Sequence, residues 1–409
     1  MKKIIALILS ALIAPAILSG CTGGAAKRTD DISNVCERFE EDFKRLCSKE
    51  YDNLIFMDTT YTAPKADYVC ELTMTPLMGK TTDEIYDFFS KTVDILTDKK
   101  YTDEEKRYEI RFVDAANSYT DDSGKSYPYS CPDVDKYKEG YETDYPWPTI
   151  DNKDYFIDMM FGVLRGYDNG SLAKFDKKEQ SYLFNYFMIN GSHYPVFFTE
   201  DLTCTDTYRL VNGEISIADA AKFAQNYLDN LKISPYEGNI PKPRVAAVNV
   251  VNIGEGCFGY NFVTTCEYKG INFDYRFSRG KVAGSTLRET DYDSRSYYSS
   301  NGDIDMIETD KISRFLNIAN GYEIIEGEPQ TTVITLETAA DMISEFLSGA
   351  MDLYVQNVSM VWLPEKTENE ITDLAAHPCW KFKLIHGGET YHTFVNMITG
   401  EIYLYVQVG

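Results

Sequence analysis

Two stretches of this chain repeat each other at an offset of 119 residues, and this repeat constrains the fold more than any other sequence feature. Residues 215–221 have the sequence ISIADAA, and residues 334–340 have the sequence ITLETAA. Ser216 and Thr335 suit the N-cap position, because their hydroxyls can accept hydrogen bonds from the free amides of a first helical turn. Apolar residues then recur on one helical face in both copies. The repeat therefore predicts two similar helices.

Strand-like segments with turns between them follow each predicted helix. They lie near 244–253, 257–268, 271–278 and 281–287 in the first copy, and near 353–363, 379–386, 390–397 and 401–407 in the second. Apolar and polar residues alternate in these segments, which is typical of a sheet with one buried face. Each copy is therefore expected to form a helix laid on a four-stranded antiparallel sheet.

This order of elements resembles the PepSY and cystatin-like family of small extracytoplasmic modules. The resemblance rests on residues 334–340, which begin the second helix, and on residues 394–402, where an apolar strand enters a Thr-Gly-Glu turn. The first copy departs from the pattern, because Arg279-Gly280-Lys281 stands at that turn. The resemblance covers about 75 residues of each copy. It implies a binding or regulatory role, such as modulating proteases or cell-wall sensor kinases, and it carries over no catalytic residues.

Residues 30–212 resemble no family, although helical and strand-like patterns predict an α+β domain. Within them, residues 117–152 are rich in Tyr, Asp and Pro and show no period, which predicts a long loop. Its aromatic residues form a candidate recognition loop that would stack on sugars or grip a peptide: Tyr127, Tyr129, Tyr145 and Trp147. The alternative, which we favour, is that these side chains pack onto the N-terminal domain.

The first twenty residues have the pattern of a signal peptide. Lys2 and Lys3 precede an apolar run that is too short for a comfortable membrane span. The run ends at Leu18-Ser19-Gly20-Cys21, which resembles the lipobox of bacterial lipoproteins. Small residues at 19 and 20 suit a narrow protease site, and the Cys21 thiol would carry the lipid. An ordinary secretory leader is the alternative. We expect an extracytoplasmic protein, anchored to the membrane lipid through acylated Cys21.

The expected fold class is α+β, with the following division. Residues 1–20 form the signal peptide, 21–29 the lipidated cysteine and flexible tether, 30–212 the N-terminal domain, 213–330 the first PepSY-like module and 331–409 the second.

Charge and cysteine usage exclude several classes of function. The formal net charge is −24, and it becomes −26 once Lys2 and Lys3 leave with the leader. This charge repels nucleic acid, so no nucleic-acid partner is expected. The eight cysteines other than Cys21 are scattered and form no CxxC pair, which argues against a zinc or thioredoxin-like site. Burial as small hydrophobes is favoured over disulfides.

No catalytic or metal-binding signature emerges from the remaining residues. His377, His386 and His392 lie close in sequence, but alternation can place them on opposite faces of a sheet, and we favour rim histidines over a metal site. Acidic pairs such as Asp303 and Asp305 are expected on the solvated surface, with a weak calcium site as the alternative. We therefore predict no catalytic residue, no metal and no cofactor.

The resulting functional hypothesis is a non-enzymatic binding or regulatory role toward an envelope protein. The competing hypothesis is a glycan- or peptide-binding surface lipoprotein, with or without hydrolytic activity. That alternative predicts a deep pocket lined by several tyrosines and two nearby carboxylates.

Overall fold

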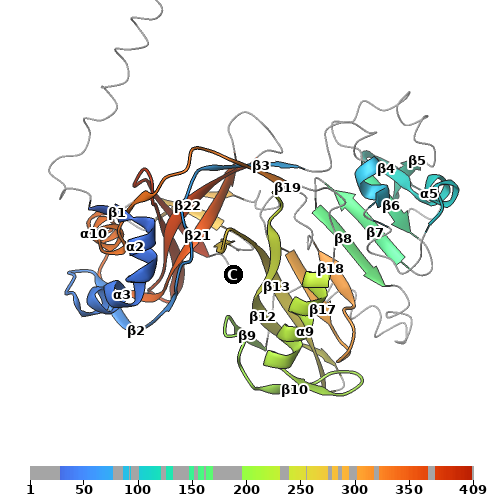
Figure 1. Ribbon diagram of the computed structural model, residues 1–409. Coiled ribbons are helices and arrows are strands. Elements are labelled where there is room, and N and C mark those ends of the chain that lie inside the picture. Colours follow the sequence, from blue (N-terminus) through green and yellow to red (C-terminus); the bar gives the residue numbers. More distant parts are fainter. Residues whose placement is uncertain are drawn as a thin grey trace, which may run out of the picture.

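The structure, a computed structural model, describes most of the chain beyond residue 27. The described residues are 28–76, 86–91, 93, 101–120, 126–131, 147–151, 155–160, 163–168, 196–230, 239–254, 256–274, 279–283, 288–293, 302–316, 322–366 and 374–407. The fold is mixed α+β and consists mostly of strands in a large mixed sheet, with few helices (Figure 1). Within the described ranges, no helix is both long and apolar enough to cross a lipid bilayer.

One part of the large sheet, here called the α9 sheet, is an antiparallel series beside helix α9 (Ile217–Asn230). Its strands in spatial order are β9 (Phe197–Thr199), β12 (Lys242–Gly254), β13 (Cys257–Tyr268), β17 (Gly302–Met306), β18 (Arg314–Leu316), β8 (Val163–Asp168), β7 (Tyr155–Met160), β6 (Trp147–Asp151), β4 (Arg111–Thr120) and β5 (Ser126–Cys131). Ala224 and Leu228 of α9 pack in one core with Tyr260 and Phe262 of β13.

The other part, here called the α10 sheet, contains the C-terminal strands. Its strands in spatial order are β16 (Arg288–Asp293), β15 (Arg279–Ala283), β24 (Ile402–Gln407), β23 (Glu389–Asn396), β22 (Leu374–His386), β21 (Leu353–Lys366) and β2 (Leu54–Thr62). Only the β2–β21 pair is parallel in this series. Strand β3 (Leu72–Pro76) also pairs with β22, and β19 (Tyr322–Glu326) pairs with β3.

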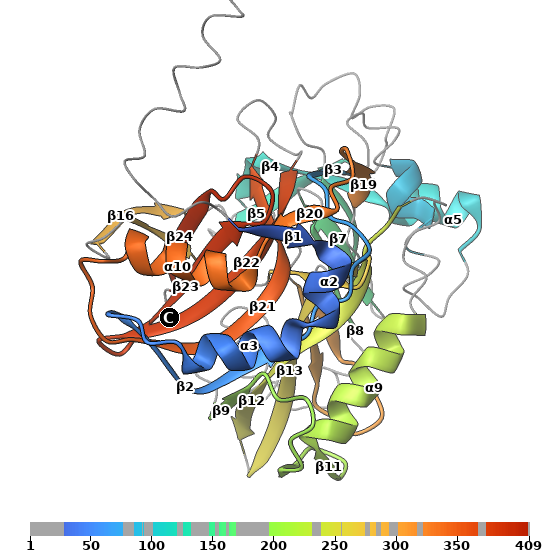
Figure 2. The same ribbon diagram turned by 60° about the vertical axis from the view of Figure 1, so that its left-hand side comes forward.

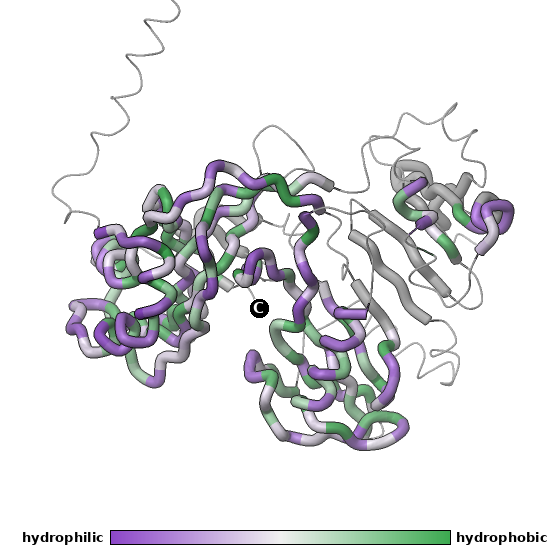
Figure 3. Tube along the Cα trace, viewed as in Figure 1, coloured by the Kyte–Doolittle hydropathy of each residue, from purple (hydrophilic) through white to green (hydrophobic). Residues whose placement is uncertain are grey.

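Three helices cover one face of the α10 sheet: α2 (Ile32–Glu37), α3 (Phe39–Ser48) and α10 (Leu336–Phe346) (Figure 2). Phe39 of α3 stacks on Trp380 of β22, with ring centroids 5.8 Å apart, and Phe382 belongs to the same core. The indole of Trp380 donates a hydrogen bond of 2.8 Å to the carbonyl of Ile334. Hydrophobic and hydrophilic residues follow one another along the three helices (Figure 3), because only one side of each helix meets this core.

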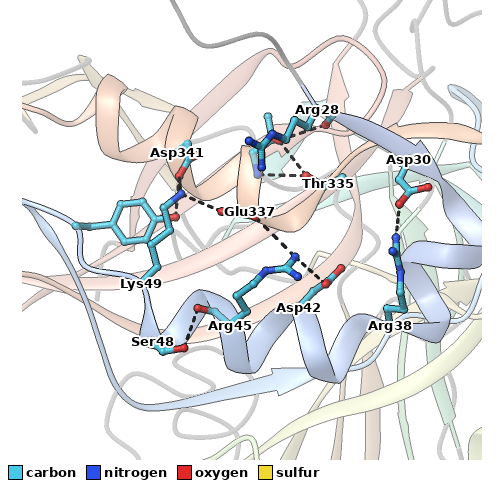
Figure 4. A network of polar contacts seen from close by, with 12 residues as sticks. Arg28, Asp30, Arg38, Asp42, Arg45, Ser48, Lys49, Thr335, Glu337 and Asp341 are labelled. Carbon is cyan, nitrogen blue, oxygen red and sulfur yellow. Dashed lines mark hydrogen bonds and ion pairs between the residues drawn. The ribbon is translucent and has the colours of Figure 1, made fainter.

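Polar contacts join α3 to α10 on the outer side of this helical layer (Figure 4). The Lys49 ammonium contacts Asp341 at 2.5 Å and Glu337 at 3.2 Å. Arg45 lies 2.9 Å from Asp42 on its own helix and 3.7 Å from Glu337. These side chains remain partly exposed and solvent screens their charges, so the apolar core below them contributes more to the docking of α3 than the ion pairs do.

Both helix starts predicted from the internal repeat are confirmed. The amide of Asp219 donates to the Ser216 hydroxyl at 3.1 Å, and the amide of Thr338 donates to the Thr335 hydroxyl at 3.3 Å. A short strand precedes each helix: β11 (Glu214–Ser216), paired with β10 (Thr207–Arg209), and β20 (Thr332–Ile334), paired with β1 (Thr29–Asp31). The two copies therefore enter their helices in the same way.

Strand β14 (Ile271–Phe273) connects the two parts of the sheet. It forms a hairpin with β13 and also pairs in parallel with residues 361–362 of β21. The amide of Asp274 donates to the carbonyl of Trp362 at 2.7 Å, and the Trp362 indole donates to the carbonyl of Tyr268 at 3.0 Å. The junction is thus made by main-chain pairing and not by a loose linker.

Two parts of the expected organisation differ from the structure. Residues 30–76, assigned from sequence to the N-terminal domain, pair with β20, β21 and β22 and share the core of the α10 sheet. The segment near 281–287, expected as the fourth strand of the first module, is β15 and pairs with β24. Periodicity fixes which side chains of a strand are buried, but it does not fix which strand lies beside it.

The predicted long loop at 117–152 is corrected in its described part. Strand β4 extends to Thr120, and β5 and β6 occupy residues 126–131 and 147–151. Tyrosine and threonine favour extended backbone, and Pro148 lies near the start of β6, where the missing N–H is tolerated. The alternation typical of a half-buried strand is absent from these segments, so their sequence predicts a loop.

Candidate functional site

Alternate residues of β22 carry positive or ionisable side chains on the face that lies opposite the helices. They are His377, Lys381 and Lys383, whereas Trp380 and Phe382 between them face the helical core. Each meets a carboxylate from a different segment of the chain: Glu71 before β3, Asp274 after β14, and Glu200 after β9. One strand thus collects three distant parts of the sequence.

His377 and Glu71 form the first of these pairs. The Glu71 carboxylate contacts the His377 Nδ1 and also accepts a hydrogen bond of 3.1 Å from the amide of Asn396. Burial alone would lower the pKa of His377, but the hydrogen bond to Glu71 and the surrounding carboxylate charge raise it overall. Burial alone would raise the pKa of Glu71, and its hydrogen bonds lower it overall. The pair joins the segment before β3 to β22.

Lys381 and Asp274 form a buried pair at the junction of the two sheet parts. The Nζ–Oδ1 distance is 2.7 Å, and the exposed fractions of the two side chains are 9% and 0%. A buried charge requires a partner, because desolvation of a single ion is costly. The pair therefore holds Asp274, the residue that follows β14, against a side chain of β22.

Lys383 and Glu200 form the third pair, at the edge of an open hollow. The Nζ–Oε2 distance is 3.1 Å. The hollow has a volume of about 310 Å³ and is lined by side chains from β2, β21, β22 and the segment after β9. These residues are Met57, Asp58, Thr60, Glu200, Gln356, Asn357 and Lys383. Because Glu200 follows a strand of the α9 sheet, the hollow lies where both parts of the sheet meet.

A β-bulge shapes one wall of this hollow. The β2–β21 register shifts between Phe56 and Thr60, and Asp58 within the bulge has a φ of 54°. The Asn357 amide donates to the Thr60 hydroxyl at 2.9 Å, which ties the bulge to β21. Bulges commonly redirect side chains at functional sites, and left-handed backbone outside glycine is uncommon. The bulge thus places Met57 and Asp58 at the hollow.

Three large apolar side chains with substantial exposure belong to the segments that line the polar hollow. Met57 is 64% exposed, and Tyr354 and Phe198 are each 43% exposed. Tyr354 stands two residues before Gln356 on β21, and Phe198 stands two residues before Glu200. We call these three residues, together with the lining of the hollow, the recognition surface. Exposed methionine and aromatic residues around a polar centre are typical of protein-binding surfaces.

Those aromatic residues singled out from sequence that the structure describes lie on other strands than the ones lining this surface. Leu18, Ser19, Gly20, Cys21 and Tyr145 lie outside the described residues. Tyr127 and Tyr129 lie on β5, and Trp147 begins β6. Their role in recognition stays a prediction.

The three C-terminal histidines are spread over the α10 sheet. His377 and His386 alternate to opposite faces of β22, and His392 pairs with Lys383 on the neighbouring strand. In the described part of the chain, no three His, Cys, Asp or Glu side chains are grouped closely enough to hold a metal ion.

The expectation that Asp303 and Asp305 lie on the solvated surface is wrong. The two aspartates are 6% and 1% exposed. The amide of Asn261 donates to both carboxylates, at 2.8 Å and 2.7 Å, and it accepts in turn from Asn249 at 2.9 Å. Hydrogen bonds to the charged form offset part of the desolvation cost, so these acids can be buried.

The comparisons with known proteins assign no family. No family model matches the chain, and no curated protein matches it. The fold is similar to the crystal structure of an uncharacterized protein from Eubacterium rectale ATCC 33656, with a TM-score of 0.43 and 13% sequence identity. The match covers 91% of this chain and 99% of that one. A similarity at this level implies no function for the chain.

Proposed function

We propose that the chain is a lipid-anchored extracytoplasmic protein that binds or regulates an envelope protein through the recognition surface. The observation that carries the proposal is that Met57 lines the hollow, while Tyr354 and Phe198 are exposed two residues before the lining residues Gln356 and Glu200. Large exposed side chains of this kind form the centre of many protein interfaces, where a few anchors supply most of the binding free energy. The role is proposed to be non-enzymatic.

The contacts of Arg28, the first described residue, support a membrane anchor that leaves the recognition surface accessible. The carbonyl of Arg28 accepts hydrogen bonds from the Thr335 amide and the Thr338 hydroxyl, each at 3.2 Å. Acylated Cys21 would lie at most about 25 Å away, at about 3.6 Å for each intervening residue. The tether joins the fold at the helical layer, whereas Lys383 lies on the opposite face of the sheet. Anchoring would therefore leave the recognition surface accessible.

The duplicated architecture belongs to the same proposal. We regard the segments 213–330 and 331–409 as copies of one PepSY-like module, each with a helix followed by antiparallel strands. The shared capping at Ser216 and Thr335 supports this view. Modules of this family imply binding or regulation, which agrees with the proposed role.

The alternative, a glycan- or peptide-binding lipoprotein with hydrolytic activity, has less support. The hollow contains two carboxylates, Asp58 and Glu200, but it is open and none of its lining residues is a tyrosine. Glu200 is also held by Lys383 and cannot easily act as a general acid. A shallow hollow next to exposed apolar side chains suits a protein partner better.

Site-specific photocrosslinking in the native host tests the partner. A photoreactive amino acid at Met57 or at Tyr354 should give adducts with the same envelope protein, identified by mass spectrometry. The same amino acid at Lys44, on α3 in the helical layer, is the control and should not give that adduct. Equal adducts from Lys44, or none from Met57 and Tyr354, would reject the proposal.

The anchor has a separate test. Cys21→Ala should leave an unlipidated precursor, because the thiol is the only atom of that residue that can accept the diacylglyceryl group. Mass spectrometry of the purified chain measures this directly. Recovery of an acylated Cys21→Ala chain would contradict the proposed anchor.

A further inference from the structure

We propose that the hollow binds the guanidinium group of an arginine presented by an extended segment of the partner protein. The inference rests on the proposed function and names the chemistry of the group that the hollow receives. It follows from the charges in the hollow, from its hydrogen-bond acceptors and from its apolar rim.

The charges in the hollow favour a cation. Lys383 and Glu200 lie 3.1 Å apart and neutralise each other, so Asp58 is the uncompensated charge of the hollow. Among the described residues, no ion pair is formed by Asp58. The chain as a whole carries a net charge of −24, which attracts basic partners over a distance of about one Debye length, roughly 8 Å at physiological salt. A cation is therefore the group that this hollow favours.

The hydrogen-bond acceptors in the hollow suit a planar group that carries several donors. The Asn357 amide nitrogen is engaged by the Thr60 hydroxyl, which leaves the amide oxygen of Asn357 as an acceptor. The Gln356 side chain adds a second amide at the same wall. A guanidinium presents several donors in one plane and can contact a carboxylate and amide oxygens together, whereas an ammonium acts as a point charge. Arginine therefore suits this set of acceptors better than lysine.

The apolar side chains near the hollow suit the aliphatic part of an arginine side chain. Met57 lines the hollow, and Tyr354 is exposed two residues before the lining residue Gln356, so both can cover the aliphatic part of an arginine side chain. A thioether adapts its shape to the group it contacts, and an aromatic ring attracts a guanidinium placed over its face. The bulge at Asp58 presents the carboxylate and Met57 from the same short segment.

Methionine-methyl NMR on the full-length chain tests the inference. The chain has 12 methionines, and the Met57 signal can be assigned from a Met57→Leu variant. Titration with N-acetyl-arginine amide should shift the Met57 methyl signal saturably. Met351 is 56% exposed but does not line the hollow, so its signal is the internal control and should stay in place.

Two matched comparisons test whether binding depends on the positive charge of the ligand and on the Asp58 carboxylate. N-acetyl-citrulline amide has nearly the same shape without the charge and should give at least a fivefold weaker apparent affinity. Asp58→Asn keeps a residue type that tolerates positive φ and should weaken arginine binding at least fivefold, with unchanged signals from the other methionines. Equal affinity for citrulline, or unchanged affinity in Asp58→Asn, would overturn the inference. A stronger response to N-acetyl-lysine amide would overturn the choice of arginine.

The two proposals can fail separately. Crosslinks from Met57 and Tyr354 to one envelope protein, without any arginine response, would leave the proposed function standing and reject the arginine site. An Asp58-dependent arginine response, with crosslinks at Lys44 equal to those at Met57, would support the site and reject the proposed partner surface.

Discussion

At the scale of single residues, His377 has a titration that differs from that of a histidine in water. Its raised pKa means that the protonated ring stabilises the fold below pH 6.5 and that this contribution is lost as the pH rises through the folded-state pKa. Glu71 has a lowered pKa, so its contribution is present above pH 4.5 and is lost on acidification. Both contributions are therefore fully present between these two values.

This titration predicts a pH dependence of stability. The melting temperature of the wild-type chain should fall more between pH 6 and pH 9 than that of His377→Gln. The corresponding difference in the free energy of unfolding should stay below about 1 kcal/mol, because the Glu71 side chain is 42% exposed and solvent screens the pair. Parallel profiles for His377→Gln and the wild type would contradict the assignment.

Single residues of the candidate site were largely beyond sequence analysis. Asp58, Glu200 and Lys383 are common residue types from three distant segments, and no motif joins them. Only the fold brings them together. The one local signal is the Met-Asp pair at 57–58 within an otherwise strand-like segment, and it gains meaning only when the bulge is known.

At the scale of elements, apolar periodicity was sufficient for α2, α3, α9 and α10, whereas the short helix α5 (Asp103–Glu109) was not predicted. The spacing of Val35, Phe39, Phe43 and Leu46 predicts the helical region 31–50, and the structure shows all four residues buried. The repeat likewise predicted α9 and α10 with their caps. The strand partners were not predictable, because Leu54 pairs with Leu353 and no local pattern encodes a contact over such a separation.

The end of α10 depends on one side chain from the segment before β2. The amide of Asn53 donates to the carbonyls of Ser344 and Leu347, at 3.0 Å and 2.9 Å, and Asn53 is 3% exposed. Carbonyls of the last helical turn have no partner within the helix, so this amide replaces the missing donors.

Asn53→Ala should therefore destabilise the chain by about 1–3 kcal/mol, since two carbonyls lose a donor in a buried place. Urea denaturation measures the free energy of unfolding. Lys44→Ala on the exposed side of α3 is the comparison and should change stability by no more than about 0.5 kcal/mol. Equal effects of the two substitutions would show that the Asn53 contacts do not hold α10.

At the scale of the whole molecule, the buried pair of Lys381 and Asp274 holds the two parts of the sheet together. Lys381→Met should destabilise the chain by about 3–5 kcal/mol, because it leaves the Asp274 charge buried without its ammonium. The double substitution Lys381→Met with Asp274→Asn should recover part of this loss. Denaturant unfolding of the single and double variants measures the effect.

Lys383→Met provides a matched control two residues along the same face. Glu200 is 41% exposed, so loss of this pair should cost no more than about 1 kcal/mol. If Lys381→Met and Lys383→Met were equally stable, burial would not distinguish the two pairs and the proposed role of Lys381 would be rejected.

The parallel pairing of β2 with β21 has a consequence for the order of events during synthesis. A ribosome makes Leu54 long before Leu353, yet the two residues are neighbours in the finished sheet. Phe39 and Phe43 must likewise wait for Trp380 before their apolar surface is covered. A nascent chain that stops before β21 would expose this surface and invite aggregation. The α10 sheet can therefore close only after the chain has been made as far as β24, and contacts of such long range are slow to form.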